Sequence, residues 1–331
     1  MHKEMMPTRG ISRRFALTGA AAGAAVAIGG QTAAQQTPQR GTRVWLDLDQ
    51  KQLDDAYDQA KYDPNIAHTI KRCASNSEIV RARLGAPKRL AYGASPIEEF
   101  DLYPTKRPNA PVNVFVHGGG WQRFSAKENA FPAELFVNAG AHFAVLDFIN
   151  VDQAGGSLQP MAEQVRRGIA WIYKNAQNLG GDPDRIYVSA HSSGAHLGGV
   201  ILVTDWEKDF ALPKDVVKGA LLCSGMYDLK PVRLSARSSY VNFTDEMEQA
   251  LSVQRHVDRI NCPVTLAHGT LETPEFIRQT HDFAATLKAA DKPVTLLVAE
   301  NYHHWEIFET LANPYGVLGR AVLEQMKLMP T

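Results

Sequence analysis

Six short apolar runs follow one another from about residue 88 onward, each bounded by Gly or Pro and rich in Val, Ile and Phe. They read PVNVFVHG, HFAVLDFI, RIYVSAHS, GALLCSG, PVTLAHG and PVTLLVAE. Continuous apolar runs of this length are typical of strands that are covered on both faces. The pattern therefore predicts a mostly parallel sheet.

Amphipathic stretches separate these runs. PMAEQVRRGIAWIYKNAQNLGG places Met161, Val165, Ile169 and Ile172 on one stripe, begins at a proline and ends at a Gly pair, which indicates a helix. TPEFIRQTHDFAATLKAA and EIFETLANPYGVLGRAVLEQM have similar patterns, the second interrupted near Pro314. Alternating strands and helices predict an α/β domain over 88–331 with helices on both faces of the sheet.

The stretch before this domain is different. Residues 44–87 are polar and charged, with helical spacing in LDDAYDQAKY and SEIVRARLG. We expect residues 35–87 to form short helices that lie over the active-site side of the domain. They are not expected to form a second domain, because 331 residues are compatible with one large α/β unit.

The first 34 residues have the pattern of a signal peptide: a basic start, a weakly apolar Ala/Gly stretch and small residues near a cleavage point after Ala33 or Ala34. Arg13 and Arg14 resemble a twin-arginine export signal. The alternatives are a disordered N-terminus or a short membrane anchor, but a spanning helix needs about 20 apolar residues. We expect export to the periplasm or secretion, with no stable membrane anchor after cleavage.

Charge and cysteine content narrow the function classes. Thirty-five basic residues balance thirty-five acidic ones, without the basic run that tracks a phosphate backbone, so nucleic acid is not an expected partner. The three cysteines are Cys73, Cys223 and Cys262. If Cys223 ends one strand and Cys262 begins the next, their separation is on the order of 15 Å, beyond the reach of a disulfide. We expect buried free thiols.

Candidate chemistry is found directly after four of the predicted strands. His117-Gly118-Gly119-Gly120-Trp121 follows the first, AHSSG with Ser192 the third, HGTLE with Glu272 the fifth and YHHW with His304 the sixth. Ligands of open α/β sheets collect at the carboxyl ends of the strands. A serine, a carboxylate and a histidine therefore arrive in that order at one edge of the sheet.

Small residues surround Ser192, with Ala190 two positions before it and Gly194 two positions after it. A strand that turns sharply into a helix with a serine at the apex needs small residues at these positions. The N–H groups of Gly119, Gly120 and Ser193 could then form an oxyanion hole. This pattern predicts a nucleophilic serine.

The combination of HGGGW, SAHSSGAHL, SGMYDL, TPEF and HHWEI resembles the α/β-hydrolase fold, within it the arylformamidase (kynurenine formamidase) and hormone-sensitive-lipase-like branch. The resemblance covers roughly residues 50–325. It implies Ser192 as the nucleophile, His304 as its general base and Glu272 as the acid, where the family usually has Asp. It also implies a metal-free and cofactor-free enzyme.

Several residue roles stay open at this stage. Asp228, in SGMYDL, is the rival acid because it follows the preceding strand, and His303 could exchange roles with His304. His117, His191 and His196 are expected to pack rather than to catalyse. The residues expected to line the substrate pocket are Trp121, Asn150, Tyr240 and Trp305.

The sequence thus predicts a serine hydrolase that cleaves an ester or activated amide of a small, aromatic substrate. The closest resemblance suggests an arylformamide substrate. Because tryptophan breakdown is intracellular, an exported enzyme fits a carboxylesterase on short-chain or aryl esters as the alternative. A non-catalytic binding protein on a hydrolase fold is the third hypothesis. The expected partner is a small molecule, and a homo-oligomer is left open.

Overall fold

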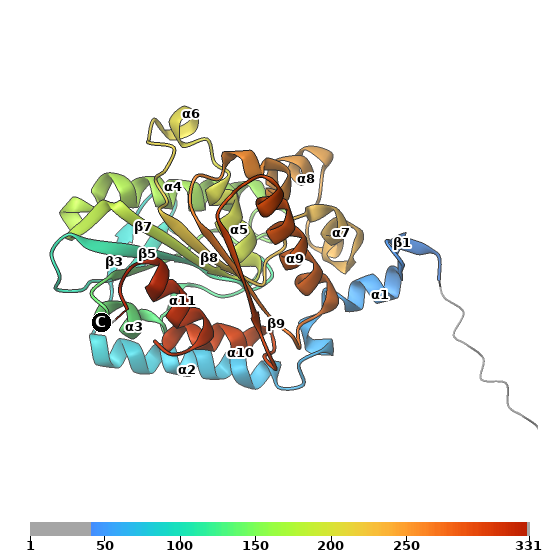
Figure 1. Ribbon diagram of the computed structural model, residues 1–331, viewed down its shortest axis with the longest axis horizontal. Coiled ribbons are helices and arrows are strands. Elements are labelled where there is room, and N and C mark those ends of the chain that lie inside the picture. Colours follow the sequence, from blue (N-terminus) through green and yellow to red (C-terminus); the bar gives the residue numbers. More distant parts are fainter. Residues whose placement is uncertain (1–40, 330–331) are drawn as a thin grey trace, which may run out of the picture. The chain divides into compact units, whose positions relative to one another are not determined.

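The computed structural model describes residues 41–329, and the signal peptide predicted over 1–34 lies outside them. An eight-stranded sheet forms the centre of this unit, in the order β10-β9-β8-β7-β5-β6-β4-β3 (Figure 1). Its strands are β3 (Lys88–Ala91), β4 (Glu99–Tyr103), β5 (Ala110–Val116), β6 (His142–Leu146), β7 (Gly181–His191), β8 (Gly219–Cys223), β9 (Val264–Gly269) and β10 (Val294–Ala299).

The six strands predicted from the apolar runs are all present, and β5 to β10 pair in parallel throughout. The prediction missed β3 and β4, which pair with each other in antiparallel orientation, and β4 also pairs antiparallel with β6. Their sequences, KRLA and EFDLY, are short and charged, and β3 is an edge strand whose residues are largely exposed. Such strands lack the continuous apolar run that marks a central strand.

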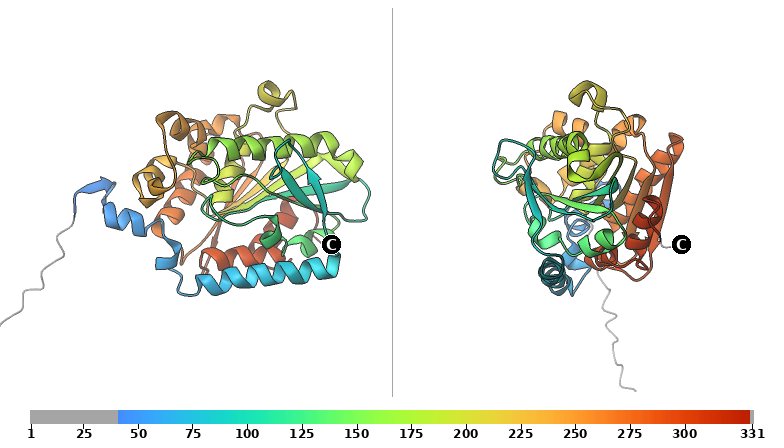
Figure 2. Two further views of the ribbon diagram at one scale, coloured as in Figure 1. Left: turned by 180° about the vertical axis from the view of Figure 1, so that it is seen from behind. Right: turned by 90° about the vertical axis from the view of Figure 1, so that its left-hand side faces the viewer.

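Alternate side chains of the central strands enter two separate hydrophobic cores. On β5, Val112, Val114 and Val116 face one core, whereas Phe115 faces the other. The first core is covered by α4 (Gln159–Asn175), α5 (Ser193–Leu202) and α9 (Pro274–Ala289). The second is covered by α3 (Ala133–Asn138), α10 (His304–Glu309) and α11 (Val317–Gln325). Helices on both faces confirm the predicted α/β architecture (Figure 2).

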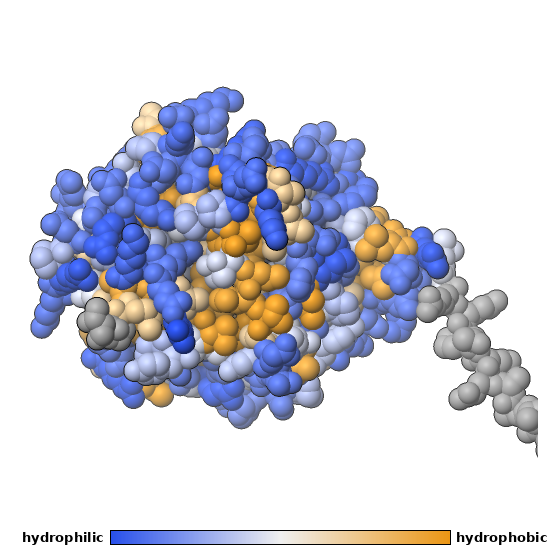
Figure 3. Space-filling view, in the orientation of Figure 1, coloured by the Kyte–Doolittle hydropathy of each residue, from blue (hydrophilic) through white to orange (hydrophobic). Residues whose placement is uncertain are grey.

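The outer edge at β10 is less covered than the centre of the sheet. Figure 3 shows apolar side chains gathered near the centre of one face, over the edge that β10 forms. Val298 of β10 is 43% exposed, whereas every residue of β5 is buried. The run PVTLLVAE was therefore correctly predicted as a strand, but it is not buried on both sides.

The stretch before the sheet contains more structure than short helices. It comprises β1 (Arg43–Trp45), β2 (Leu48–Asp49), α1 (Gln50–Asp55), η1 (Gln59–Lys61) and α2 (Ile66–Leu84). Helix α2 is 19 residues long and buries Cys73, Ser77 and Val80, which share one face at helical spacing. It lies alongside α10 (Figure 1), where Arg72 pairs with Glu309 at 2.5 Å.

The remaining elements are η2 (Ala126–Asn129), η3 (Gln177–Leu179), α6 (Trp206–Phe210), α7 (Leu229–Leu234), η4 (Ala236–Ser239), α8 (Asp245–Leu251), η5 (Val253–Arg259) and η6 (Thr310–Ala312).

All three cysteines are free and buried, as the sequence predicted. Cys223 pairs in register with Ala267, near the end of β9 that is far from Cys262. Burial raises the pKa of Cys73 and that of Cys262 to about 12, so neither thiol is a nucleophile at neutral pH.

Among residues 41–329, no helix has the length and apolar character required to cross a membrane.

Candidate active site

Ser192 occupies a sharp turn between β7 and α5. Its backbone has φ of 58° and ψ of −130°, a conformation that a non-glycine residue adopts only under constraint. Gly194 explains the constraint, because a Cβ at this position would lie 2.2 Å from the carbonyl oxygen of Val116. Ala190 fits because it faces Gly198 of α5, where a Cβ would lie 3.0 Å from that of Ala190. The turn has the geometry predicted for a nucleophile.

Glu272 and His304 form a buried pair. Nδ1 of His304 lies 2.7 Å from Oε2 of Glu272, and both residues are at most 3% exposed. Because an ionised carboxylate only accepts hydrogen bonds, Nδ1 carries a hydrogen and donates a hydrogen bond to Glu272. The opposite nitrogen, Nε2, then holds a free lone pair that can accept a proton.

The second oxygen of Glu272 is also fully engaged. Oε1 accepts hydrogen bonds from the Gly269 amide at 2.7 Å and from the Ser224 hydroxyl at 2.6 Å. These bonds offset the cost of burying a carboxylate and fix its orientation toward the imidazole. Ser224 follows β8 directly and has a positive φ of 55°. The sequence analysis missed this residue, although it precedes the glycine of SGMYDL.

Ser192 and His304 line one small cavity of about 170 Å³. No hydrogen bond joins their side chains among the described residues, and such contacts are often long before a substrate binds. The cavity lies where β5, β7 and the loop after β10 end. Its other lining residues are Tyr57, Asp58, Gln59, Ala60, Ile66, Ile70, Gly119, Gly120, Gln122, Arg123, Arg237, Tyr240 and Trp305.

The pocket residues predicted from the sequence divide into two groups. Tyr240 and Trp305 line the cavity, but Trp121 and Asn150 do not. Trp121 is buried behind it, with its ring edge-on to His196. The Asn150 side chain accepts a hydrogen bond from the Gln153 amide at 2.8 Å and thereby stabilises its own turn.

The glycine loop after β5 faces the same cavity. Gly119 and Gly120 have φ of 113° and 65°, which favour glycine, and both line the cavity. Over residues 41–329, neither amide donates a hydrogen bond to the protein. The loop is tied to the serine turn, because the Trp121 amide donates to Ser193 Oγ at 3.1 Å. The arrangement places unused N–H groups beside Ser192.

The adjacent histidines 303 and 304 have different surroundings. Nδ1 of His303 lies 2.8 Å from Glu306 at the start of α10, whereas His304 contacts Glu272 and the cavity. The geometry therefore joins His304, and not His303, to the serine and the carboxylate.

The three other histidines near the serine are buried and hydrogen-bonded to backbone carbonyls. Their partners are Gly118 for His117, His304 for His191 and Leu251 for His196. Burial lowers the pKa of each, to about 4 for His196. They are therefore neutral packing groups at physiological pH.

Asp228 lies in a different network from the histidine. Its carboxylate accepts from the Lys230 amide at the start of α7 and pairs with Arg255 at 3.1 Å. A residue that caps a helix and neutralises an arginine has its acceptor capacity in use. The geometry thus favours Glu272 over Asp228 as the partner of His304.

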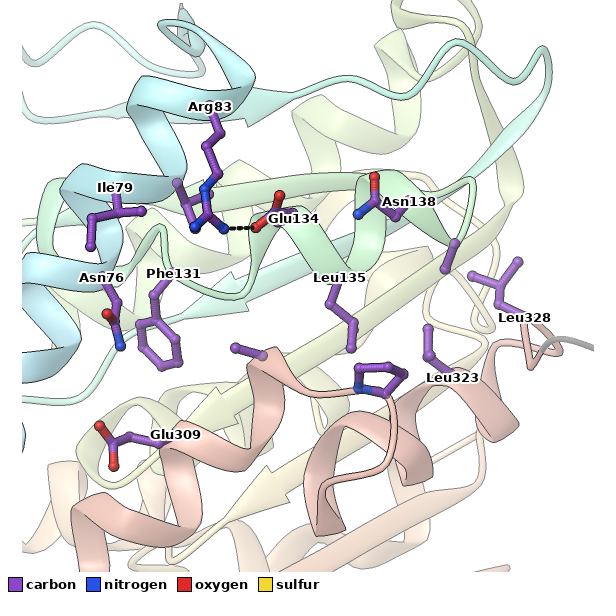
Figure 4. Close-up of a pocket in the computed structure, with 14 residues that line it drawn as sticks. Asn76, Ile79, Arg83, Phe131, Glu134, Leu135, Asn138, Glu309, Leu323 and Leu328 are labelled. Atoms are coloured by element: carbon purple, nitrogen blue, oxygen red, sulfur yellow. Dashed lines mark hydrogen bonds and ion pairs between the residues drawn. The ribbon is translucent and has the colours of Figure 1, made fainter.

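A larger groove of about 680 Å³ lies between α2, α3, η6 and α11. Figure 4 shows Arg83 of α2 reaching toward Glu134 of α3, and the two pair at 3.0 Å. The groove contains neither a serine nor a histidine.

In the part of the chain that the structure describes, no group of three or more His, Cys, Asp or Glu side chains could hold a metal ion.

Comparisons with known proteins agree with this geometry. The BD-FAE family model matches residues 100–287. Kynurenine formamidases from Danio rerio and Salmo salar are 26% and 28% identical to this chain, and each alignment covers 85% of the chain and 98% of the relative. A propionate-bound esterase from Thermogutta terrifontis has a TM-score of 0.63 at 19% identity, covering 75% of this chain and 97% of that one. The chain belongs to the BD-FAE family and has the α/β-hydrolase fold.

Proposed function

We propose that this protein is a serine hydrolase that cleaves a small ester or amide through Ser192, His304 and Glu272. The observation that carries the proposal is the buried 2.7 Å contact between Glu272 and His304, with His304 lining the same cavity as Ser192. Kinship with kynurenine formamidases, which cleave an amide, and with an esterase supports both substrate classes.

In the proposed first step, Nε2 of His304 takes the proton of the Ser192 hydroxyl as its oxygen attacks the substrate carbonyl carbon. Glu272 keeps the imidazole in the required tautomer and stabilises its positive charge. The N–H groups of Gly119, Gly120 and Ser193 stabilise the oxyanion, each contributing about 3 kcal/mol to the transition state.

Collapse of the tetrahedral intermediate completes the acylation. His304 returns its proton to the leaving oxygen or nitrogen, and the acyl group stays on Ser192. Water then attacks the acyl-enzyme with His304 again as the base, which releases the acid and regenerates the hydroxyl. No metal or cofactor enters the proposed cycle.

The size of the cavity supports a small substrate. Its volume of about 170 Å³ is close to the ~150 Å³ of an engineered cavity that holds one benzene molecule. The side chains of Tyr57, Tyr240 and Trp305 surround it with aromatic surface. We therefore propose an aryl formamide or aryl ester, with short-chain carboxylic esters as the alternative.

A fluorophosphonate probe tests the nucleophile. We expect the purified protein to be labelled on the peptide that contains Ser192, and Ser192→Ala to abolish the labelling. Ser238→Ala is a matched control on η4, where the hydroxyl donates to the backbone carbonyl of Arg233. Absence of labelling in a correctly folded wild-type sample would instead favour a non-catalytic binding protein.

A rate comparison tests the substrate class. We expect kcat/KM for N-formylkynurenine to exceed that for short-chain aryl esters if the arylformamidase resemblance extends to substrate choice. The opposite order would establish the carboxylesterase alternative.

We also propose that the protein acts outside the cytoplasm. The support is the twin-arginine pattern around Arg13 and Arg14. Fractionation of cells that express the full chain tests this: Arg13→Lys together with Arg14→Lys should retain the protein in the cytoplasm.

A further inference from the structure

Arg237 brings a positive charge into the catalytic cavity. It lies on η4 and lines the cavity together with Ser192 and His304. Its guanidinium lies 5.9 Å from the ring centre of Tyr57, 5.7 Å from that of Trp121 and 6.0 Å from that of Phe276. Aromatic faces attract a cation, especially where water is displaced. The three rings therefore hold the charge in place.

Most of the hydrogen-bonding capacity of Arg237 is unused. A guanidinium carries five N–H donors, and the described residues accept from two of its nitrogens. Nη1 donates to the Tyr240 hydroxyl at 2.6 Å and Nη2 to the Tyr57 carbonyl at 3.0 Å. Nε is buried and has no partner among the described residues. An unpaired buried donor is costly unless a ligand satisfies it.

The charge of Arg237 is also uncompensated within residues 41–329, because no carboxylate forms an ion pair with it. By contrast, nearby Arg233 pairs with Asp245, and Arg278 pairs with Glu275. Asp58 lines the same cavity but is exposed and accepts from the Ala60 amide. The cavity thus contains a fixed guanidinium that has no paired carboxylate among the described residues.

Arg237 lies directly beside the glycine loop. A Cβ built on Gly120 would lie 3.4 Å from Nη1 of Arg237 and 3.7 Å from the Tyr240 hydroxyl. A substrate whose carbonyl oxygen approaches the Gly120 amide would therefore have its neighbouring atoms next to the guanidinium. Arg237 is close enough to select the substrate while the chemistry takes place at Ser192.

We propose that Arg237 is a specificity-determining residue that binds a carboxylate of the substrate, so the preferred ester or amide carries a carboxylate group. This inference rests on the proposed hydrolase function. A planar guanidinium matches a carboxylate through two parallel N–H···O bonds. Bound in this way, the substrate would neutralise the cation and engage donors that the protein leaves free.

Two pairs of substrates test the proposal, each pair differing in one carboxylate. N-formylanthranilate and formanilide differ on the leaving-group side, and 4-nitrophenyl hydrogen glutarate and 4-nitrophenyl butyrate differ on the acyl side. We expect the wild type to prefer the anion in at least one pair. Arg237→Gln should lower the ratio of kcat/KM for the anion over the neutral substrate about tenfold or more.

Arg233→Gln is the matched control, because it removes the same charge from an arginine that pairs with Asp245 and Glu248 outside the cavity. It should leave the ratio unchanged. Arg237→Lys should restore part of the preference, since it keeps the charge but loses the two-pronged contact. Equal losses for the anionic and neutral substrates in both pairs would overturn the proposal and assign Arg237 a purely structural role.

A measurement on the wild type covers the case in which Arg237→Gln does not fold. Benzoate should inhibit hydrolysis of a neutral ester competitively and about tenfold more tightly than the isosteric benzamide. Equal inhibition would contradict the proposal. Failure of the hydrolase function itself is distinguishable, because the wild type would then turn over none of these substrates and would not be labelled by the fluorophosphonate probe.

Discussion

Two of the cavities in the described residues, the groove beside α2 and the cavity at Ser192, differ both in size and in chemistry. The groove between α2, α3 and α11 has a volume of about 680 Å³, whereas the cavity at Ser192 has only about 170 Å³. In the groove, the cation Arg83 pairs with Glu134 across the opening. At Ser192, the cation Arg237 has no paired carboxylate among the described residues, and the glycine amides have no protein acceptor. Unsatisfied polar groups, rather than volume, distinguish the proposed reactive site.

The largest effect should follow from Ser192→Ala. Removal of the nucleophile should lower kcat about 10⁶-fold, as in other enzymes in which a serine and a histidine act as a unit. Steady-state kinetics measures this loss, and circular dichroism should show an unchanged fold. A mutant that retains more than a small fraction of wild-type turnover would remove the chemical distinction between the two cavities.

A second test replaces one carboxylate at each site, the buried partner of His304 and the partner of Arg83 in the groove. Glu272→Gln should lower kcat about 10⁴-fold, because the amide no longer stabilises the correct tautomer and charge of His304. Glu134→Gln changes the same atoms in the groove, where Glu134 only pairs with Arg83, and should leave kcat within about twofold. Similar losses in both variants would show that Glu272 acts through folding stability.

The buried histidines around the serine predict a pH effect on stability. Burial lowers the pKa of His196 from 6.5 to about 4, so the unfolded chain binds more protons between these values. The contribution of His196 to the free energy of unfolding is therefore fully present above about pH 6.5. As the pH falls to about 4, the free energy of unfolding decreases by roughly 3 kcal/mol at most. His191 and His117 shift in the same direction.

Urea unfolding at a series of pH values measures this effect. In His196→Gln, the free energy of unfolding should fall less steeply between pH 6.5 and 4, because the replacement does not titrate. An unchanged slope would show that His196 is protonated in the folded protein.

The smallest effect should come from the groove. Ile79 lines it and is 47% exposed, so Ile79→Ser should change the free energy of unfolding by less than about 0.5 kcal/mol. Because the groove does not share lining residues with the cavity at Ser192, kcat/KM should stay within about twofold. A larger change in kcat/KM would reveal coupling between the two cavities.

Much of the fold could be predicted because burial on both faces leaves a continuous apolar run. The six runs became β5 to β10, and the residues after them, including Glu272 and His304, meet at one edge. Strands β3 and β4 escaped prediction because charged residues interrupt their short apolar runs. A continuous apolar run identifies a strand even where one side is exposed, as in β10, whereas a run interrupted by charged residues does not.

The contacts between distant segments could not be predicted from local patterns. Nothing in the sequence near Ser224 shows that its hydroxyl reaches Glu272, 48 positions later. Similarly, the guanidinium of Arg237 contacts the rings of Tyr57, Trp121 and Phe276. These three residues come from separate stretches of the chain. The ion pair between Arg83 and Glu134 in the groove likewise depends on how α2 packs against α3.

Part of the cavity wall comes from a stretch of the chain far in sequence from the residues that are proposed to react. Tyr57, Gln59, Ile66 and Ile70, from the segment before the sheet, form part of the cavity wall. Changes in this segment can therefore alter which molecules enter while leaving Ser192, His304 and Glu272 in place. Proteins that share the same proposed reactive residues could therefore differ in substrate range through substitutions in this N-terminal segment.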